Sequence, residues 1–140
     1  MSTPRCSSDR FLDDTDPQFV SLCLDTGHVE YCSGDNRDIV GRHPDRISYI
    51  HLKQVNPRVA AQAREEHVGF YEAVQRGAMV EPPLGAPAMK PLIDDLAALN
   101  GDLRLIIEQD MYPAPKGSAK AIAARTRDYF AGLGLPPAEV

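Results

Sequence analysis

The sequence predicts an α/β fold built around a parallel sheet, and two observations carry this prediction. Three short apolar runs, at residues 19–24 (FVSLCL), 47–50 (ISYI) and 103–107 (LRLII), have the near-continuous hydrophobicity of strands buried on both faces. Segments in which apolar residues recur at helical spacing separate these runs. The resulting order of strand, helix, strand, helix, helix, strand and helix indicates parallel strands joined by helical crossovers.

Composition narrows the classes of protein that fit. The 140 residues are 43% hydrophobic and 25% charged, which is typical of one globular domain. The net charge of -5 argues against a nucleic-acid partner, and no apolar run approaches the roughly 20 residues that cross a bilayer. We expect a cytoplasmic protein that binds neither nucleic acid nor membrane. Cys6, Cys23 and Cys32 lack paired spacing, which predicts reduced thiols.

The first half of the chain contains two of the predicted strands. Residues 1–15 are interpreted as a disordered start followed by a helix remnant at 9–14, which the sequence Thr-Asp-Pro at 15–17 ends. The strand at 19–24 stops at a turn that begins with Asp25. A short helix at 35–42 places Ile39 and Val40 inward, and the second strand, 47–50, follows it and stops before His51.

The second half is predicted to alternate helices with one strand. Asn56 and Pro57 suit the cap and first position of a helix whose apolar spacing continues to Gly77. The remaining elements are a proline-rich loop at 81–87, a helix at 89–99 that ends at 100–101, a strand at 103–107, a helix at 118–130 and a frayed tail at 135–140.

Each predicted strand is followed by a side chain that can bind a metal ion: Asp25, His51 and Glu108. The carboxyl ends of parallel strands lie along one rim of the sheet, so these three side chains are expected to converge. Two carboxylates and an imidazole suit a divalent ion such as Mn²⁺, Co²⁺, Mg²⁺ or Zn²⁺, and the mixed oxygen and nitrogen set favours Mn²⁺ or Co²⁺.

Each residue also has a simpler interpretation. Asp25 suits a cap of the following turn, His51 a hydrogen-bonded strand end, and Glu108 a solvated loop. His28 is either a substrate-contacting imidazole or a loop residue, and Lys53 either binds a substrate oxygen or phosphate or is solvated. We expect the remaining histidines, at 43 and 67, to lie outside the site.

Four segments resemble the sugar phosphate isomerase/epimerase superfamily, which has the xylose isomerase-like TIM barrel, and most closely its inosose-dehydratase-like branch. They are LCLDTGH at 22–28, RISYIHLK at 46–53, the connection at 55–77 and IIEQDMYP at 106–113. The resemblance implies that Asp25, His51 and Glu108 bind the metal. It also implies that His28 contacts the substrate and that Glu108 doubles as an acid/base group.

The chain departs from the family pattern in two local features and in length. Gln54 stands where relatives usually have an aspartate, and the usual PLGEG loop reads PLGAP at 83–87. A complete barrel takes about 250 residues and eight strands. The three strands here resemble the last three of the barrel, so residues 16–134 are expected to be a C-terminal barrel portion.

The resulting prediction is a divalent-metal-dependent sugar or polyol isomerase, epimerase or dehydratase that acts through an enediolate-type intermediate. In this interpretation the chain is a truncated or split barrel, inactive or weakly active alone, that forms a homo-oligomer or joins a complementing N-terminal half-barrel. The alternative is a non-catalytic metal- or sugar-binding fragment that docks on a partner supplying the missing strands. An abasic-site endonuclease shares the fold, but four histidines and a charge of -5 argue against it.

Overall fold

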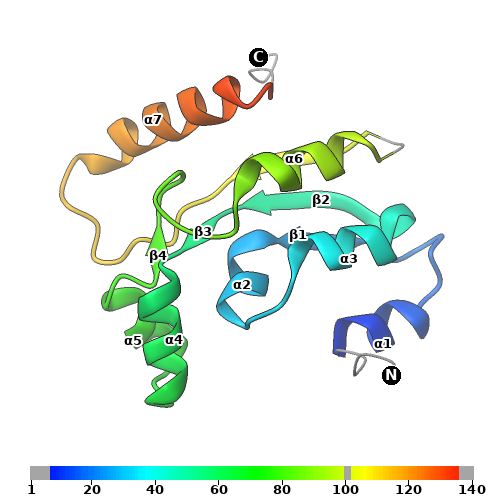
Figure 1. The fold of residues 1–140 in the computed structure, drawn as a ribbon, viewed down its shortest axis with the longest axis horizontal. Coiled ribbons are helices and arrows are strands. Elements are labelled where there is room, and N and C mark those ends of the chain that lie inside the picture. The colour runs from blue at the N-terminus through cyan, green and yellow to red at the C-terminus, as the bar shows by residue number, and fades with distance from the viewer. Residues whose placement is uncertain (1–6, 100–101, 136–140) are drawn as a thin grey trace.

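Three parallel strands form the centre of the structure, a computed structural model that describes residues 7–99 and 102–135. The strands are β1 (Leu22–Asp25), β2 (Ile47–Leu52) and β5 (Arg104–Ile107), and they lie side by side in the order β1-β2-β5. Both pairings are parallel. The predicted α/β fold with a parallel sheet is therefore confirmed for these residues (Figure 1).

Seven α-helices and two further short strands complete the described part of the chain. The helices are α1 (Ser7–Asp13), α2 (Thr26–Tyr31), α3 (Asn36–Arg42), α4 (Pro57–Glu65), α5 (Phe70–Gln75), α6 (Met89–Ala97) and α7 (Ser118–Gly132), with a 3₁₀ turn, η1, at Pro44–Arg46. The short strands are β3 (Gln54–Val55) and β4 (Met79–Val80). The disordered start predicted before residue 9 is wrong for residues 7 and 8, which belong to α1. The rest of that start (1–6), the predicted helix end at 100–101 and residues 136–140 of the predicted frayed tail lie outside the described residues.

The predicted turn after β1 is instead the short helix α2. Asp25 is its N-cap, and the Asp25 side chain accepts hydrogen bonds from the backbone N–H groups of Gly27 and His28. Thr26 and Gly27 are buried at the start of this helix. The sequence signal was the same in both interpretations, because an aspartate that caps a turn also caps a helix.

The single helix expected from residue 57 to 77 is also wrong. The structure has α4 and α5, separated at His67, whose φ of 55° ends the first helix. The break folds the two helices against each other, so that Ala63, Ala73 and Ala78 form a small buried cluster. As a consequence, Tyr71, which fitted the helical spacing, is 62% exposed.

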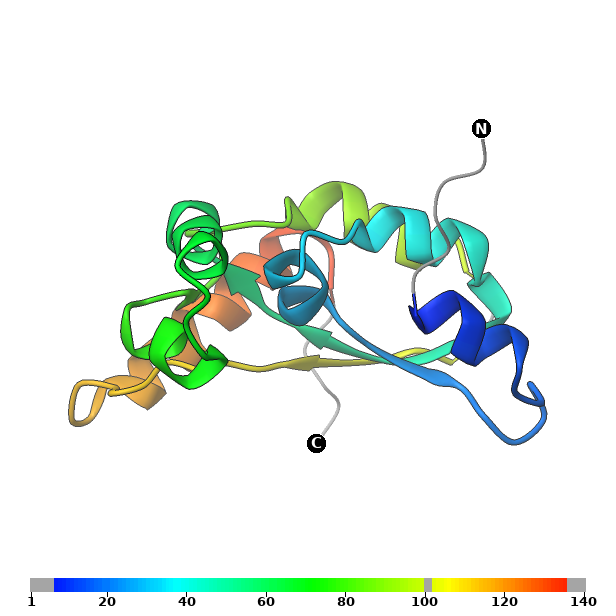
Figure 2. The same cartoon turned by 90° about the horizontal axis from the view of Figure 1, so that it is seen from below.

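The main core lies on one side of the sheet. Helices α2, α3 and α6 cover this side, as Figure 2 shows. The buried residues are Leu24, Ile39, Val40, Ile47, Ile50, Leu52, Met89, Leu92, Ile93, Leu96 and Phe130. The inward placement predicted for Ile39 and Val40 is confirmed.

The opposite face of the sheet is not covered by the elements that the structure describes (Figure 2). Cys23 is exposed on β1, and Ile106 on β5 is 40% exposed. Alternate residues of a strand point to opposite faces. The expectation that these strands are buried on both faces is therefore not met within the described residues.

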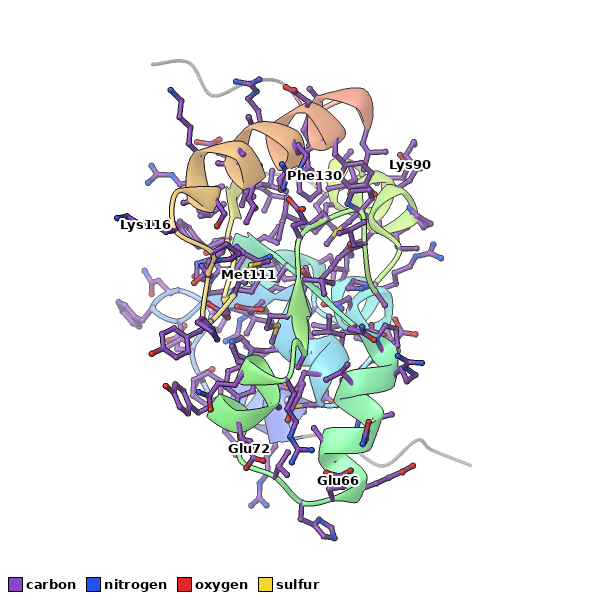
Figure 3. The ribbon with its side chains drawn as sticks, turned by 90° about the vertical axis from the view of Figure 1, so that its left-hand side faces the viewer. Glu66, Glu72, Lys90, Met111, Lys116 and Phe130 are labelled. Atoms are coloured by element: carbon purple, nitrogen blue, oxygen red, sulfur yellow. The ribbon has the colours of Figure 1, made fainter. Side chains whose placement is uncertain are left out.

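Helix α7 runs beside β5, the strand at one edge of the sheet (Figure 1). Figure 3 shows Phe130 beneath this helix, where it joins the main core. Glu66, directly after α4, and Glu72, on α5, lie at the far end of the molecule. No helix of the described residues is long and apolar enough to cross a membrane.

Beyond the carboxyl ends of β1 and β2, the chain turns into the antiparallel pair β3 and β4. Gln54, at the start of β3, is 2% exposed and holds the proline-rich loop through two hydrogen bonds. Its Nε2 donates to the Pro87 carbonyl at 2.7 Å, and its Oε1 accepts from the Gly85 N–H at 3.0 Å. Gln54 thus fixes the position of the proline-rich loop.

Candidate metal site

Strand register brings the three strand-end residues together. Asp25 on β1 is the direct neighbour of His51 on β2, and His51 is the neighbour of Ile106 on β5. Glu108 follows Ile106 by two residues, and its N–H donates to the Leu52 carbonyl at 3.3 Å. Because side chains alternate along a strand, Glu108 emerges on the same face as Ile106 and therefore as His51.

The two carboxylate oxygens of Asp25 have different partners. Oδ1 accepts the N–H groups of Gly27 at 3.1 Å and His28 at 2.9 Å, and so caps α2. Oδ2 instead faces Nδ1 of His51 at 3.5 Å and Nζ of Lys53 at 2.9 Å. The capping and ligand interpretations of Asp25 are therefore compatible, because each uses a different oxygen.

The donor atoms of Asp25, His51 and Glu108 fit a divalent cation. One ligand atom from each residue lies within 4.8 Å of the other two. The shortest separation is 2.6 Å, between Nδ1 of His51 and Oε2 of Glu108. The side chains are 17%, 29% and 37% exposed respectively, so the site is open to solvent. A partly open set of two carboxylates and one imidazole is compatible with a divalent ion that also binds substrate oxygens.

Lys53 places a positive charge inside the same cluster. Its side chain is only 5% exposed, and Nζ lies 2.9 Å from Oδ2 of Asp25, 3.1 Å from Oε2 of Glu108 and 2.8 Å from Oδ2 of Asp110. An ammonium group has three donors, and three carboxylates surround this one. Burial opposes the charge, but hydrogen bonds to Asp110, Asp25 and Glu108 outweigh that effect and raise the pKa of Lys53.

Residue 53 is held in place by its backbone as well. The buried Thr26 hydroxyl donates to the Lys53 carbonyl and accepts from the Lys53 N–H, both at 2.8 Å. Gly27 packs so closely on this residue that an added Cβ would lie 2.6 Å from Cβ of Lys53. Through the hydrogen bonds of Thr26 and the close packing of Gly27, the DTGH segment holds the end of β2 next to the end of β1.

His28 lies at the border of the cluster. Its Nε2 is 3.8 Å from Oδ2 of Asp25 and 3.8 Å from Oδ2 of Asp110, and its side chain is 46% exposed. The His28 ring packs against Phe70 of α5, with the ring centroids 5.0 Å apart. Of the candidate residues, it is the most accessible to a ligand that approaches from solvent.

The structure therefore brings together all five residues selected from the sequence. The other two histidines lie elsewhere: His43 contacts Asp9 at 2.8 Å, and His67 is exposed. Sequence reasoning missed Asp110 as a direct partner of Lys53 and Thr26 as the residue that fastens β2. The position of Asp110, two residues beyond Glu108, was the available signal, since that spacing returns a side chain to the same face of an extended chain.

Comparison with known proteins finds similar sequences, although no protein-family model matches the chain. An inosose dehydratase of Geobacillus thermodenitrificans is 36% identical over 106 residues, which are 76% of this chain and 36% of the relative. An inosose dehydratase of Lacticaseibacillus casei is 32% identical over 129 residues, or 91% of this chain and 43% of the relative. One from Clostridium tetani is 30% identical over 122 residues, or 87% of this chain and 41% of the relative. The chain thus spans about two fifths of the length of the curated relatives it matches.

Proposed function

We propose that the chain carries the metal-binding part of a sugar or polyol isomerase, epimerase or dehydratase active site. The observation that carries the proposal is the convergence of Asp25, His51 and Glu108, from three neighbouring strand ends, within 4.8 Å. Similarity to inosose dehydratases favours the dehydratase, with a cyclic polyol ketone as substrate. We propose Mn²⁺ or Co²⁺ as the ion, because the donor set is mixed, with Mg²⁺ and Zn²⁺ as the other candidates.

A dehydratase of this kind removes a proton from the carbon beside a carbonyl and hydroxide from the next carbon, so that water leaves and a C=C bond forms between the two carbons. A bound divalent ion would supply Lewis-acid polarisation of substrate oxygens. Glu108 is the proposed acceptor of the carbon-bound proton, since its side chain is the most exposed of the triad. His28 is the proposed contact to a substrate oxygen at the open border. Lys53 is proposed to contact the substrate as well. To do so, its ammonium group must exchange one of its three carboxylate partners for a substrate oxygen.

We further propose that the chain works as a truncated or split barrel. Two features support this: the sheet face that the described elements leave uncovered, and the greater length of the relatives. A complementing half-barrel or a second copy would cover that face and add ligands to the three already present. The alternative is a non-catalytic metal- or sugar-binding fragment that docks on a partner. The same uncovered sheet face favours it, but it predicts ion or sugar binding without turnover.

The first test measures ion binding by titration calorimetry with Mn²⁺ and Co²⁺. We expect the wild-type chain to bind one ion and His51→Ala to lose at least tenfold in affinity, because one of three ligands is gone. His67→Ala is the matched control, since His67 is exposed and outside the cluster. Equal affinity in the wild type and His51→Ala would overturn the metal site.

The second test measures turnover of an inosose with Co²⁺ or Mn²⁺. The chain alone is expected to show little or no activity. We expect activity when it is mixed with the part of the Lacticaseibacillus casei relative outside the matched segment, and its loss in His51→Ala. Full activity of the chain alone would overturn the split-barrel proposal. Ion binding with no activity in any mixture would favour the non-catalytic alternative.

A further inference from the structure

The ammonium group of Lys53 contacts the same carboxylate oxygens that would hold an ion. Because Oδ1 of Asp25 caps α2, Oδ2 is the oxygen left for a cation, and Lys53 Nζ lies 2.9 Å from it. The same holds at Glu108, whose Oε2 faces both His51 Nδ1 at 2.6 Å and Lys53 Nζ at 3.1 Å. A divalent ion and the lysine therefore compete for one pair of oxygens.

The Lys53 side chain is enclosed in the cluster, which places its ammonium close to both oxygens. Its side chain is 5% exposed, and both its backbone N–H and its carbonyl are hydrogen-bonded to the Thr26 hydroxyl. Within the cluster, the third carboxylate, Asp110, lies 2.8 Å from Nζ and is outside the triad. Nε2 of His28 lies further from Nζ, at 3.5 Å. Asp110 is thus the one carboxylate of the cluster that remains available to the ammonium when an ion takes the other two.

We propose that Lys53 is a resident counter-ion of the metal site, which neutralises Asp25 and Glu108 in the metal-free protein and lowers their affinity for the ion, and that Asp110 retains the lysine once the ion has bound. The inference rests on the proposed function, because it concerns the same triad. It adds that the affinity of the site is set by residues that do not bind the metal.

A purely structural role for Lys53 predicts the opposite result on substitution. If the lysine only holds the carboxylates in position, removing it disorders the triad and weakens ion binding. If it competes, removing it leaves Asp25, Glu108 and Asp110 mutually repelling, so the metal-free protein is less stable and the ion binds more tightly. The sign of the change in affinity therefore separates the two roles.

The test compares Lys53→Met with the wild type by titrating Mn²⁺ and following free Mn²⁺ by electron paramagnetic resonance, a readout independent of turnover. Methionine keeps most of the length of the buried side chain and removes its charge. We expect Lys53→Met to bind Mn²⁺ roughly tenfold more tightly, to melt at a lower temperature without metal, and to gain more from Mn²⁺ than the wild type does. Lys90→Met, which removes an exposed lysine paired with Asp94, is the matched control and should behave as wild type.

A second variant tests the role of Asp110. Asp110→Asn is expected to weaken Mn²⁺ binding severalfold, because the lysine then depends more on Asp25 and Glu108. In the Lys53→Met background the same substitution should have a smaller effect, since no lysine remains to be retained. Equal effects in the two backgrounds would overturn the role given to Asp110.

The result that overturns the counter-ion role is unchanged or weaker Mn²⁺ binding by a Lys53→Met protein that keeps the wild-type circular dichroism spectrum. Lys53→Arg keeps the charge and should not tighten binding; if it tightens binding as much as methionine does, loss of charge is not the cause. Failure of the proposed function looks different. In that case Mn²⁺ binding is absent from both proteins, or is present and insensitive to His51→Ala.

Discussion

The Thr26 hydroxyl forms two hydrogen bonds with the backbone of Lys53, donating to its carbonyl and accepting from its N–H, both at 2.8 Å. Thr26 is fully buried, so water cannot replace either bond. This contact joins the residue after β1 to the residue after β2. It therefore fixes the spacing between Asp25, which precedes Thr26, and the lysine that lies against it.

Replacing Thr26 with valine tests the strength of this contact. The substitution preserves shape and leaves the N–H and carbonyl of Lys53 buried without partners, which we expect to lower the free energy of unfolding by about 2–3 kcal/mol. Thr126→Val is the matched control, because Thr126 is also buried but its hydroxyl lacks a hydrogen-bond partner among the described residues. The control should be neutral or stabilising by up to about 1 kcal/mol. Urea unfolding measures both, and equal losses would contradict the assignment.

The divided roles of Asp25 predict different outcomes for asparagine and alanine at this position. Asparagine caps helices as well as aspartate does, so Asp25→Asn should keep α2 and lose mainly the charged oxygen that faces the cluster. Asp25→Ala should lose both, with about 1 kcal/mol of additional destabilisation from the missing cap.

Thermal melts with and without excess Mn²⁺ distinguish the two Asp25 variants. We expect neither variant to show the Mn²⁺-induced increase in melting temperature of the wild type, and only Asp25→Ala to have reduced helical signal without metal. A wild-type response of Asp25→Asn to Mn²⁺ would show that the Asp25 charge is dispensable for binding.

Gln54 is expected to control the order of the proline-rich loop. Gln54→Leu would leave the Pro87 carbonyl and the Gly85 N–H without their side-chain partner, which should cost about 1–3 kcal/mol. Hydrogen exchange at the Gly85 amide is the direct measurement and should become faster. Gln75→Leu, at an exposed position of α5, is the control and should leave that exchange rate unchanged. Unchanged exchange in Gln54→Leu would remove Gln54 from this role.

Cys23 is expected to react slowly with alkylating reagents near neutral pH. Desolvation of the thiol by its surroundings and the negative charges of Asp25 and Glu108 raise the pKa of Cys23, and the positive charge of Lys53 only partly opposes them. A raised pKa means that less thiolate is present at a given pH, so the rate should increase up to a pH above the usual thiol value of about 8.5. Peptide mapping after iodoacetamide treatment measures this midpoint for each cysteine.

The same assay tests the cause of the Cys23 shift. Asp25→Asn removes one nearby negative charge, so the midpoint of Cys23 alkylation should move to lower pH. Cys32, a free thiol at the C-terminal end of α2, serves as the internal reference and should not move. A Cys23 midpoint unaffected by Asp25→Asn would remove Asp25 as a cause and leave desolvation and the charge of Glu108.

Local sequence patterns were enough to predict the parallel sheet and the functional residues near the carboxyl ends of its strands. Continuous apolar runs and capping residues are local signals, because burial of a strand and the cap of a helix depend on a few consecutive residues. Asp25, His51 and Glu108 were found in this way. Relating them to one rim needed only the rule that parallel strands align their carboxyl ends.

Two other features, the helix break at His67 and the position of Lys53, depend on tertiary packing and cannot be predicted from local patterns. The break at His67 depends on how α4 and α5 pack, so the helical spacing of the sequence continued across it. The position of Lys53 among three carboxylates depends on strand register and on the buried hydroxyl of Thr26, which lies 27 residues away along the chain. A charged side chain at a strand end is equally compatible with solvent and with a buried cluster. Only the folded arrangement of the neighbouring strands determines which of the two it occupies.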